Sequence, residues 1–266
     1  MTLKVADLNG THLHYADQGR QDAPVLVFSN SLGTDLRIWD DVVAIFAPTF
    51  RVITYDKRGH GLSGIGDEPY SIDLHTRDLV ALLDHLGVHS AIVCGLSVGG
   101  LIAQHLAAIA PARVRGLILC DTAPKIGDAT GWNARIDAIT KGGMDVIGDA
   151  VIERWLSENY RTGHPAMSAL YRAMLVRTPV AGYGGTCAAL RDADLTTTTS
   201  ALTIPVLCVG GSVDQSTPPE LVRAMADGIP GAGFALIDGV GHLPPIEAPQ
   251  ELCRLIDGFI KENSLV

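Results

Sequence analysis

The sequence predicts an α/β protein with a mostly parallel, doubly wound sheet and an all-helical segment inserted late in the chain. Short apolar runs alternate with segments of helical length, as in a chain of parallel strands joined by helices. The runs are apolar at consecutive positions, which is typical of strands buried on both faces of a sheet. Hydrophobic residues make up 47% of the 266 residues, enough for one large core.

A small antiparallel pair of strands is predicted at the start of the chain. Apolar and polar residues alternate over residues 2–7 and again over residues 11–17. Asn9-Gly10 lies between the two segments, and this dipeptide favours the type I′ turn of a two-residue hairpin. The hairpin is therefore expected to precede the parallel part of the sheet.

The other strands and helices of the core follow in alternation. Strands are expected over the apolar runs 25–28, 51–55, 91–94, 114–120, 204–210 and 233–237. Helices are expected over 36–46, 71–86, from Gly100 onward, and over 249–260. Ser71 is suited to cap the second of these helices and Gly87 to end it.

One block interrupts this alternation. Between Pro124 and about Leu202 no strong strand run appears, and helices are expected over 132–140, 144–158, 165–177 and 180–193. An all-helical insertion at this place is interpreted as a cap over the ends of the strands. The predicted division is a first part of the core over 1–123, a helical cap over 124–202 and a second part of the core over 203–266.

Charge and cysteine usage restrict the partners and the compartment. The formal net charge of −9 argues against nucleic acid or an anionic membrane as a partner, so an anionic substrate would need local cations. The five cysteines form no CxxC pair, which is typical of a reducing compartment. Residues 1–20 lack the pattern of a signal peptide, and no run reaches the roughly 18 apolar residues of a membrane span. We expect a soluble, cytoplasmic protein.

The pentapeptide Gly95-Leu96-Ser97-Val98-Gly99 matches the pattern G-x-S-x-G and lies between a predicted strand and a predicted helix. A serine on so sharp a turn is held in strained backbone, with its hydroxyl above the sheet edge and near the positive end of the helix. Ser97 is interpreted as a nucleophile. The alternative is a glycine-rich turn whose serine only caps the helix.

A serine nucleophile needs a base and an acid that orients the base. His242 is the candidate base, because it lies in a glycine-flanked loop directly after the last predicted strand. Asp214 is the candidate acid, because it follows strand 204–210 and precedes a helix that begins with proline. Both loops are expected at the same sheet edge as Ser97. The alternative for Asp214 is that it only caps local turns.

Other histidines are expected to be solvated or structural. His12, His14, His85 and His89 lie in polar segments and are expected at the surface. His105 lies in the helix that follows the candidate nucleophile and is expected to be structural. The chain shows no metal-binding cluster and no dinucleotide-binding pattern, so no cofactor and no metal are expected.

Nearly the whole chain resembles an α/β-hydrolase with a helical cap. The candidate residues follow in the order Ser97, Asp214 and His242, which is the order of the triad in that fold. The run Asp56-Lys57-Arg58-Gly59-His60-Gly61 is similar to the D-x-R-G-x-G turn that braces the core of these hydrolases. A bracing role is therefore expected of Arg58, and binding of the substrate is the alternative.

The resemblance also implies an oxyanion hole made of two backbone N–H groups. One belongs to Val98, directly after the nucleophile. The other belongs to Leu32, because Asn30-Ser31 stands where the family usually carries His-Gly before the donor residue.

Four segments narrow the resemblance to 3-oxoadipate enol-lactonases. They are Ser29-Asn30-Ser31-Leu32-Gly33-Thr34-Asp35, Gly95-Leu96-Ser97, Trp132-Asn133-Ala134-Arg135-Ile136 and residues 187–194. Val98 departs from the family, which commonly carries Met there, but it keeps the N–H group. The resemblance implies opening of the enol-lactone to 3-oxoadipate through an acyl-enzyme, in the breakdown of aromatic compounds. The implied partner is a small, anionic lactone.

Such a substrate needs a cation in an otherwise acidic protein. Trp132 and Arg135 are three residues apart and share a face of the first predicted cap helix. We predict that Arg135 pairs with the substrate carboxylate and that Trp132 walls the pocket. The alternative is a solvated Arg135 and a Trp132 in the core of the cap.

Three other functions stay open. A general carboxylesterase or perhydrolase and a carbon–carbon hydrolase use the same scaffold, and a non-catalytic receptor of this fold could bind a small ligand. Ser97 excludes the dehalogenases and epoxide hydrolases that carry Asp at the elbow. Hydrolysis of an activated ester that is lost in Ser97→Ala separates an enzyme from a receptor.

Overall fold

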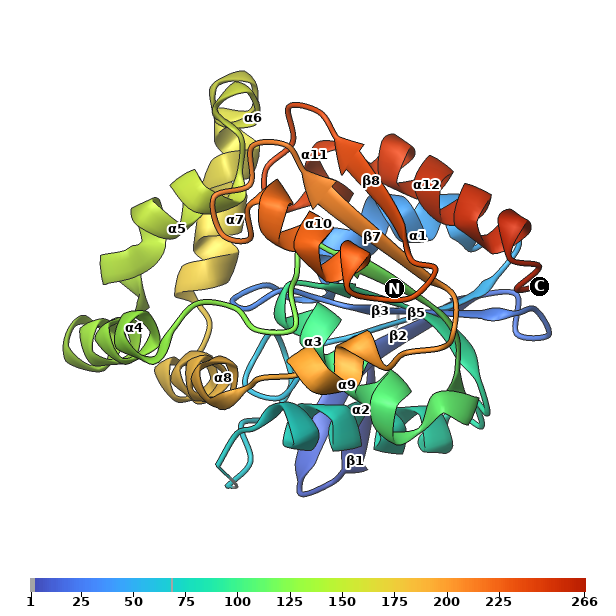
Figure 1. The fold of residues 1–266 in the computed structure, drawn as a ribbon. Coiled ribbons are helices and arrows are strands. Elements are labelled where there is room, and N and C mark those ends of the chain that lie inside the picture. The colour runs from blue at the N-terminus through green and yellow to red at the C-terminus, as the bar shows by residue number, and fades with distance from the viewer. Residues whose placement is uncertain (1–2, 68) are drawn as a thin grey trace.

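The computed structural model describes residues 3–67 and 69–266, so residue 2 of the first predicted strand lies outside the described residues. The eight strands of the described residues form one sheet in the order β1-β2-β4-β3-β5-β6-β7-β8 (Figure 1). They are β1 (Lys4–Leu8), β2 (Thr11–Gly19), β3 (Val25–Ser29), β4 (Arg51–Tyr55), β5 (Ala91–Leu96), β6 (Val114–Cys120), β7 (Val206–Gly211) and β8 (Gly233–Ile237). Pairing is antiparallel for β1 with β2 and for β2 with β4, and parallel from β4 through β8. The predicted α/β class with a mostly parallel sheet is confirmed.

The first turn and the core helices agree with the sequence to within a few residues. Asn9 and Gly10 have φ of 48° and 75°, the two positive values that a type I′ turn requires. The core helices are η1 (Leu36–Trp39), α1 (Asp40–Phe46), α2 (Ile72–His85), α3 (Val98–Ile109), η2 (Pro111–Arg113), α10 (Pro219–Asp227), α11 (Pro244–Glu247) and α12 (Pro249–Glu262). Among the described residues no helix has the length and apolar character needed to cross a membrane.

One predicted helix is divided into two elements, and another begins two residues earlier than expected. The segment expected as one helix over 36–46 begins with a 3₁₀ turn, because the Asp35 carboxylate accepts a hydrogen bond from the Arg37 N–H and caps a tighter first turn. Helix α3 begins at Val98 rather than Gly100, directly after the strained serine. The Ser71 cap is as expected, since its hydroxyl accepts the Leu74 N–H at 3.0 Å.

The sheet is buried on both faces, and alternate residues of its strands enter two separate cores. On β3, Leu26 and Phe28 belong to the core that includes residues of α1 and α12, whereas Val27 between them belongs to the core that includes residues of α2, α3 and α10. Successive side chains of a strand point to opposite faces, so a strand covered on both sides must be apolar at every position. This explains why the central strands lack polar alternation.

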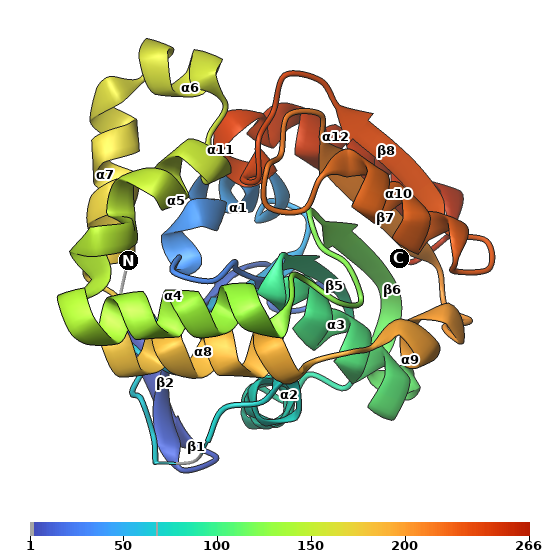
Figure 2. The same cartoon turned by 60° about the vertical axis from the view of Figure 1, so that its left-hand side comes forward.

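Helices α4–α9 lie within residues 124–202, and α4–α8 cover one end of the sheet (Figure 2). They are α4 (Ala129–Gly142), η3 (Met144–Ile147), α5 (Gly148–Trp155), α6 (Glu158–Gly163), α7 (Pro165–Val176), α8 (Val180–Asp192) and α9 (Thr196–Ser200). In Figure 2, α4 and α8 run side by side across the front of the molecule, and the two are in contact. The small helix α9 packs instead on α3 of the core, where Thr199 donates a hydrogen bond to Gln104 at 2.7 Å.

The helix predicted over 144–158 is wrong, since the structure forms three elements there. A 3₁₀ turn, η3, precedes α5, and α5 ends at Leu156 in extended backbone. The Ser157 hydroxyl then accepts the Tyr160 N–H at 3.1 Å and begins α6 as its N-cap. A serine hydroxyl that accepts a hydrogen bond from a backbone N–H three residues later favours the start of a new helix over continuation of the preceding one.

Buried charged side chains hold the loop after β4 in place. Arg58 is fully buried, and its guanidinium binds both carboxylate oxygens of Asp78 on α2, at 2.5 and 2.6 Å. Asn9 donates a further hydrogen bond to Asp78 at 2.8 Å. The side chain of Arg58 therefore ties the loop, α2 and the first hairpin together.

The expectation that His14 is solvated is wrong. His14 is buried, and its Nδ1 lies 2.8 Å from Asp56, the first residue of the same loop. The other three histidines of that group, His12, His85 and His89, are exposed as expected. His14 lies on β2, and its side chain points toward the loop after β4. The polarity of the residues next to His14 in the chain does not indicate this contact.

Replacing Asp78 with alanine should lower the free energy of unfolding by about 3–5 kcal/mol, because it removes the carboxylate that accepts two hydrogen bonds from the buried Arg58 guanidinium. Urea unfolding of both proteins measures this loss. The matched control is Asp22→Ala, which removes the exposed partner of Arg20 and should leave the free energy of unfolding nearly unchanged. Equal stabilities of the Asp78 variant and the wild type would contradict the bracing role.

Candidate active site

Ser97 lies at the end of β5 and immediately before α3, in the strained backbone that the pentapeptide predicts. Its φ of 58° and ψ of −119° are rare for a residue with a side chain. Its N–H donates to the Cys120 carbonyl at 3.0 Å, and its carbonyl accepts the Thr122 hydroxyl at 2.7 Å. These bonds to the end of β6 hold the turn in place, with the serine at the N-terminal end of a helix.

The two glycines of the pentapeptide are required by close packing. A Cβ on Gly95 would collide with the carbonyl oxygen of Gly99, inside the same turn. A Cβ on Gly99 would collide with the backbone of Ser29, at the end of the neighbouring β3. The turn therefore lies directly against the loop that follows β3.

Asp214 and His242 lie side by side in the loops after β7 and β8. Nδ1 of His242 is 2.8 Å from Oδ2 of Asp214, and both residues are almost completely buried. Asp214 also accepts hydrogen bonds from the Thr217 hydroxyl and from the Ser216 N–H, each at 2.7 Å. Burial would raise the pKa of Asp214, but the charge and hydrogen bonds of these neighbours outweigh it and hold that pKa below its usual value.

A second carboxyl group, Asp121, lies beside this pair. It follows β6 with a φ of 44°, is fully buried, and accepts the Gly211 N–H at 2.7 Å. One of its oxygens lies within 4.8 Å of both Asp214 and His242. Burial and the charge of Asp214 raise the pKa of Asp121 well above its usual value, which favours the neutral acid form of this group. The sequence analysis did not identify it, although it directly follows a predicted strand.

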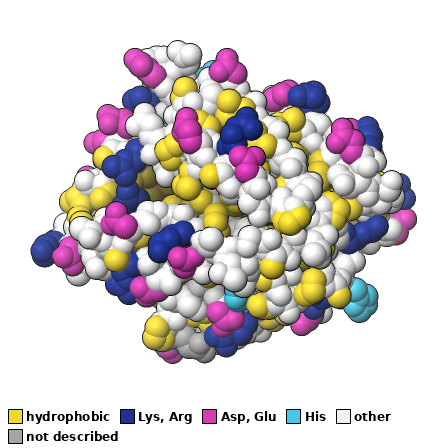
Figure 3. Space-filling view, in the orientation of Figure 1, with side chains coloured by type: hydrophobic (Ala, Val, Ile, Leu, Met, Phe, Trp, Pro, Cys, Tyr) yellow, Lys and Arg dark blue, Asp and Glu magenta, His cyan; other side chains and the backbone are white. Residues whose placement is uncertain are grey.

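Ser97 and His242 line the same cavity, of about 420 Å³, between the strand ends and the inserted helices. The space-filling view shows a hollow there, with Lys and Arg side chains at its rim (Figure 3). Leu32, Trp132 and Arg135 line this cavity too. The structure thus brings both cap residues named from the sequence to the cavity that contains the serine.

Leu32 belongs to the loop after β3, which side-chain hydrogen bonds hold in shape. The Asn30 amide donates to the Thr34 carbonyl, and the Thr34 hydroxyl donates to the Ser31 carbonyl at 2.9 Å. Val98 is the first residue of α3, so its N–H belongs to the open N-terminal turn of that helix. Val98 directly follows Ser97 in the chain, and Leu32 lines the same cavity as Ser97.

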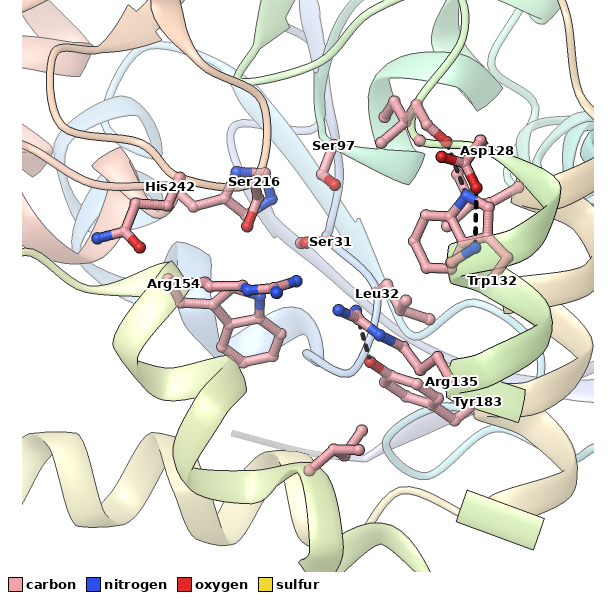
Figure 4. Close-up of a pocket in the computed structure, with 17 residues that line it drawn as sticks. Ser31, Leu32, Ser97, Asp128, Trp132, Arg135, Arg154, Tyr183, Ser216 and His242 are labelled. Carbon is pink, nitrogen blue, oxygen red and sulfur yellow. Dashed lines mark hydrogen bonds between the residues drawn. The ribbon is translucent and has the colours of Figure 1, made fainter. Parts of the chain in front are cut away.

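The cavity contains a second arginine that the sequence analysis missed. Arg154 on α5 lines the cavity together with Arg135 on α4, and Figure 4 shows the two guanidinium groups pointing toward one another. Arg135 lies over the Trp132 ring at 5.3 Å and donates to the Tyr183 hydroxyl at 3.5 Å. Within residues 3–67 and 69–266, neither guanidinium forms an ion pair with a carboxylate. Two facing cations repel one another, so the arrangement favours an anion between them.

The end of α5 is fastened to the loop that carries His242. The His242 N–H donates to the Trp155 carbonyl at 2.8 Å. The Glu247 carboxylate accepts the Ser157 N–H at 3.2 Å and the Gly241 N–H at 3.1 Å. Through these bonds the helix that carries Arg154 and the loop that carries the histidine form one connected unit.

Comparison with known proteins agrees with this geometry. Residues 26–255 match the sequence profile of the alpha/beta hydrolase family. The chain is 34% identical over 249 residues to 3-oxoadipate enol-lactonase 2 of Acinetobacter baylyi, covering 94% of this chain and 93% of that protein. The crystal structure of the enol-lactonase from Burkholderia xenovorans superimposes with a TM-score of 0.94 at 36% identity, over 97% of this chain and 100% of that one. A malate-bound esterase from Thermogutta terrifontis superimposes with a TM-score of 0.91 at 28% identity, over 98% and 99% of the two chains. The chain belongs to the alpha/beta hydrolase family.

Proposed function

We propose that the protein hydrolyses 3-oxoadipate enol-lactone to 3-oxoadipate in the breakdown of aromatic compounds. The observation that carries this proposal is one cavity with Ser97 and His242 on one side and the guanidinium groups of Arg135 and Arg154 on the other. A small lactone with a carboxylate side chain fits both halves of this arrangement. The similarity of the chain to two enol-lactonases supports the same substrate.

In the first half of the reaction, the Ser97 oxygen attacks the lactone carbonyl carbon while His242 takes the serine proton through Nε2. Asp214 holds the Nδ1–H of the histidine and stabilises the imidazolium that forms. The N–H groups of Leu32 and Val98 bind the oxygen that becomes negative. The bond from the acyl carbon to the ring oxygen then breaks, and His242 returns the proton to that oxygen.

Ring opening is favourable because the leaving oxygen is an enol oxygen, which is a better leaving group than an alkoxide and converts to a ketone. The ketone stays attached to the acyl group on Ser97. In the second half, His242 removes a proton from water, the resulting nucleophile attacks the acyl carbon, and the serine oxygen leaves with a proton from His242. The product is a dicarboxylate with one ketone.

The two arginines give the cavity its preference for a substrate with a free carboxylate. Replacing Arg135 or Arg154 with alanine should lower kcat/KM for the enol-lactone by about 10- to 100-fold, the size of a lost charge-assisted contact. Hydrolysis of the neutral ester p-nitrophenyl acetate should change by less than about 3-fold, because that ester has no carboxylate to bind. Steady-state kinetics on both substrates measure the two effects.

The matched control is Arg172→Ala. Arg172 is also a cap arginine, but it lies on α7 and pairs with Asp149 at 2.5 Å. Its replacement should leave both rates unchanged. If the Arg135 and Arg154 variants lost the two activities equally, the guanidinium groups would have a structural role and the carboxylate assignment would be wrong.

The substrate itself is tested by ultraviolet-monitored hydrolysis of 3-oxoadipate enol-lactone beside a neutral short-chain ester. Fast lactone turnover with slow ester turnover would agree with the proposal. Equal or reversed rates would instead indicate a general carboxylesterase that uses the same serine.

A further inference from the structure

Lys57 has a buried ammonium group that the proposed reaction does not use. It follows β4 and is 1% exposed, and its Nζ donates a hydrogen bond to the carbonyl oxygen of Ser31 at 2.6 Å. Among the residues that the structure describes, no carboxylate forms an ion pair with this ammonium. Burial of a charge without a paired counter-charge costs much free energy, which a methionine of similar length would avoid. The position therefore suits a function of the charge better than a packing role.

The acceptor of this hydrogen bond lies in the loop beside the serine. The Ser31 carbonyl accepts from Lys57, from the Thr34 hydroxyl at 2.9 Å and from the Thr34 N–H at 3.4 Å. A carbonyl oxygen with three donors, one of them charged, is strongly polarised. The same peptide group ends in the N–H of Leu32.

The planar peptide group transmits this polarisation to the cavity. No described residue has a cis peptide bond, so the C=O of Ser31 and the N–H of Leu32 point in opposite directions. The C=O points to Lys57 in the protein interior, so the N–H points away from Lys57. Ser31 and Leu32 both line the cavity with Ser97 (Figure 4). Within the described ranges the Leu32 N–H has no hydrogen-bond acceptor. This is expected of an N–H group that binds an oxygen atom of a ligand.

We propose that Lys57 is a positioning residue for the oxyanion hole. Its ammonium fixes the Ser31–Leu32 peptide group and withdraws electron density from it, which makes the Leu32 N–H a stronger donor to the oxyanion formed at Ser97. Hydrogen bonds that share a peptide group strengthen one another, and a donor that is already oriented needs no reorganisation during the reaction. The inference rests on the proposed function for the role of Leu32 as an oxyanion donor.

The charged and titratable groups around Lys57 determine when it is an ammonium. Burial lowers the pKa of Lys57 to about 7, against the opposing attraction of Asp56 and Asp35. His60 and His75 also face it, and burial together with the Lys57 charge lowers the pKa of each, so both are neutral. Lys57 is therefore largely charged at pH 6 and largely neutral at pH 9.

The test compares Lys57→Met, which keeps the length of the side chain but no donor, with Lys57→Gln, which can keep a neutral donor. Lys57→Met should lower kcat by about 10-fold on both the enol-lactone and p-nitrophenyl acetate, and Lys57→Gln by about 3-fold, because both reactions form the same oxyanion. KM should stay within about 2-fold, since the ground state makes little use of this donor. The melting temperature of Lys57→Met should equal or exceed that of the wild type, because an unpaired buried charge is removed.

The pH dependence separates the charge from a structural role. The ratio of wild-type kcat to Lys57→Gln kcat should fall toward one between pH 6 and pH 9, as the wild type loses its ammonium. A ratio that stays constant over this range would overturn the proposal, and it can be measured even if Lys57→Met fails to fold.

Ser97→Ala distinguishes the two proposals. If it retains hydrolysis, the serine mechanism is wrong, whatever Lys57 does. If it abolishes hydrolysis while a folded Lys57→Met keeps a kcat within about 2-fold of wild type, only the role of Lys57 is wrong. Lys261→Met, at an exposed lysine on α12 that pairs with Asp257, is the control for loss of a lysine charge.

Discussion

Ser97→Ala should lower kcat for the enol-lactone by about 10⁴- to 10⁶-fold, because the acyl-enzyme can no longer form and only the binding site and oxyanion donors remain. The residual rate is measured by following the enol-lactone absorbance at high enzyme concentration. The variant should still bind 3-oxoadipate, since Arg135 and Arg154 are intact. Calorimetric titration of the product into the variant tests this binding.

Ser97→Gly provides a control for backbone strain. Glycine adopts a φ near 58° without steric cost, so this variant should be more stable than wild type by about 1 kcal/mol while it is equally inactive. Urea unfolding measures the gain. Loss of activity with a gain of stability would separate the chemical role of the hydroxyl from misfolding. A residual rate within about 100-fold of wild type in both variants would overturn the nucleophile assignment.

Asp214→Asn should lower kcat by about 10³- to 10⁴-fold with little change in KM. The amide has nearly the shape of the carboxylate, but it no longer stabilises the imidazolium and it admits the wrong tautomer of His242. Steady-state kinetics between pH 6 and pH 9 measure the loss. Thr217→Val is a matched control, because it removes the hydroxyl that donates to Asp214 at 2.7 Å and leaves the carboxylate itself in place. That variant should lose less than about 10-fold.

The neighbouring carboxyl gives a second comparison with Asp214. Burial and the charge of Asp214 raise the pKa of Asp121 and favour its neutral acid form, which an amide resembles, so Asp121→Asn should lower kcat by less than about 5-fold. Equal losses in the Asp121 and Asp214 variants would show that the two carboxyl groups act as one unit, and the assignment of the acid to Asp214 alone would then be wrong.

Several parts of the site could be predicted because their signals are local. The turn at Ser97 is contained in five residues, and its strand and helix adjoin it directly. Asp214 and His242 are 28 residues apart, but each follows a predicted strand, and the carboxyl ends of parallel strands meet at one sheet edge. The sheet topology therefore places the two residues near Ser97 without any knowledge of side-chain contacts.

Other parts depend on tertiary neighbours and could not be predicted in this way. Arg154 lies within a segment that was expected to be one helix over 144–158, and its direction depends on where α5 ends, which the Ser157 cap determines. His14 and Lys57 occur in polar stretches that suggest exposure, but the hairpin and the loop after β4 fold against one another and bury both. Their burial follows from packing between segments distant in the chain, 42 residues for His14 with Asp56 and 26 residues for Lys57 with Ser31, which no local pattern describes.

The bonds between α5 and the histidine loop limit how freely caps can be exchanged among enzymes of this fold. The helical segment between β6 and β7 begins and ends in loops, so it could be expected to be exchangeable as one unit. Yet the Trp155 carbonyl and the Ser157 N–H complete the hydrogen bonding of His242 and Glu247 in the core. A chimaera that received a foreign cap without these two backbone groups would leave the His242 loop without two of the hydrogen bonds that hold it. A transplant should therefore carry residues 155–157 together with the core as a fixed junction, and vary only the helices on either side.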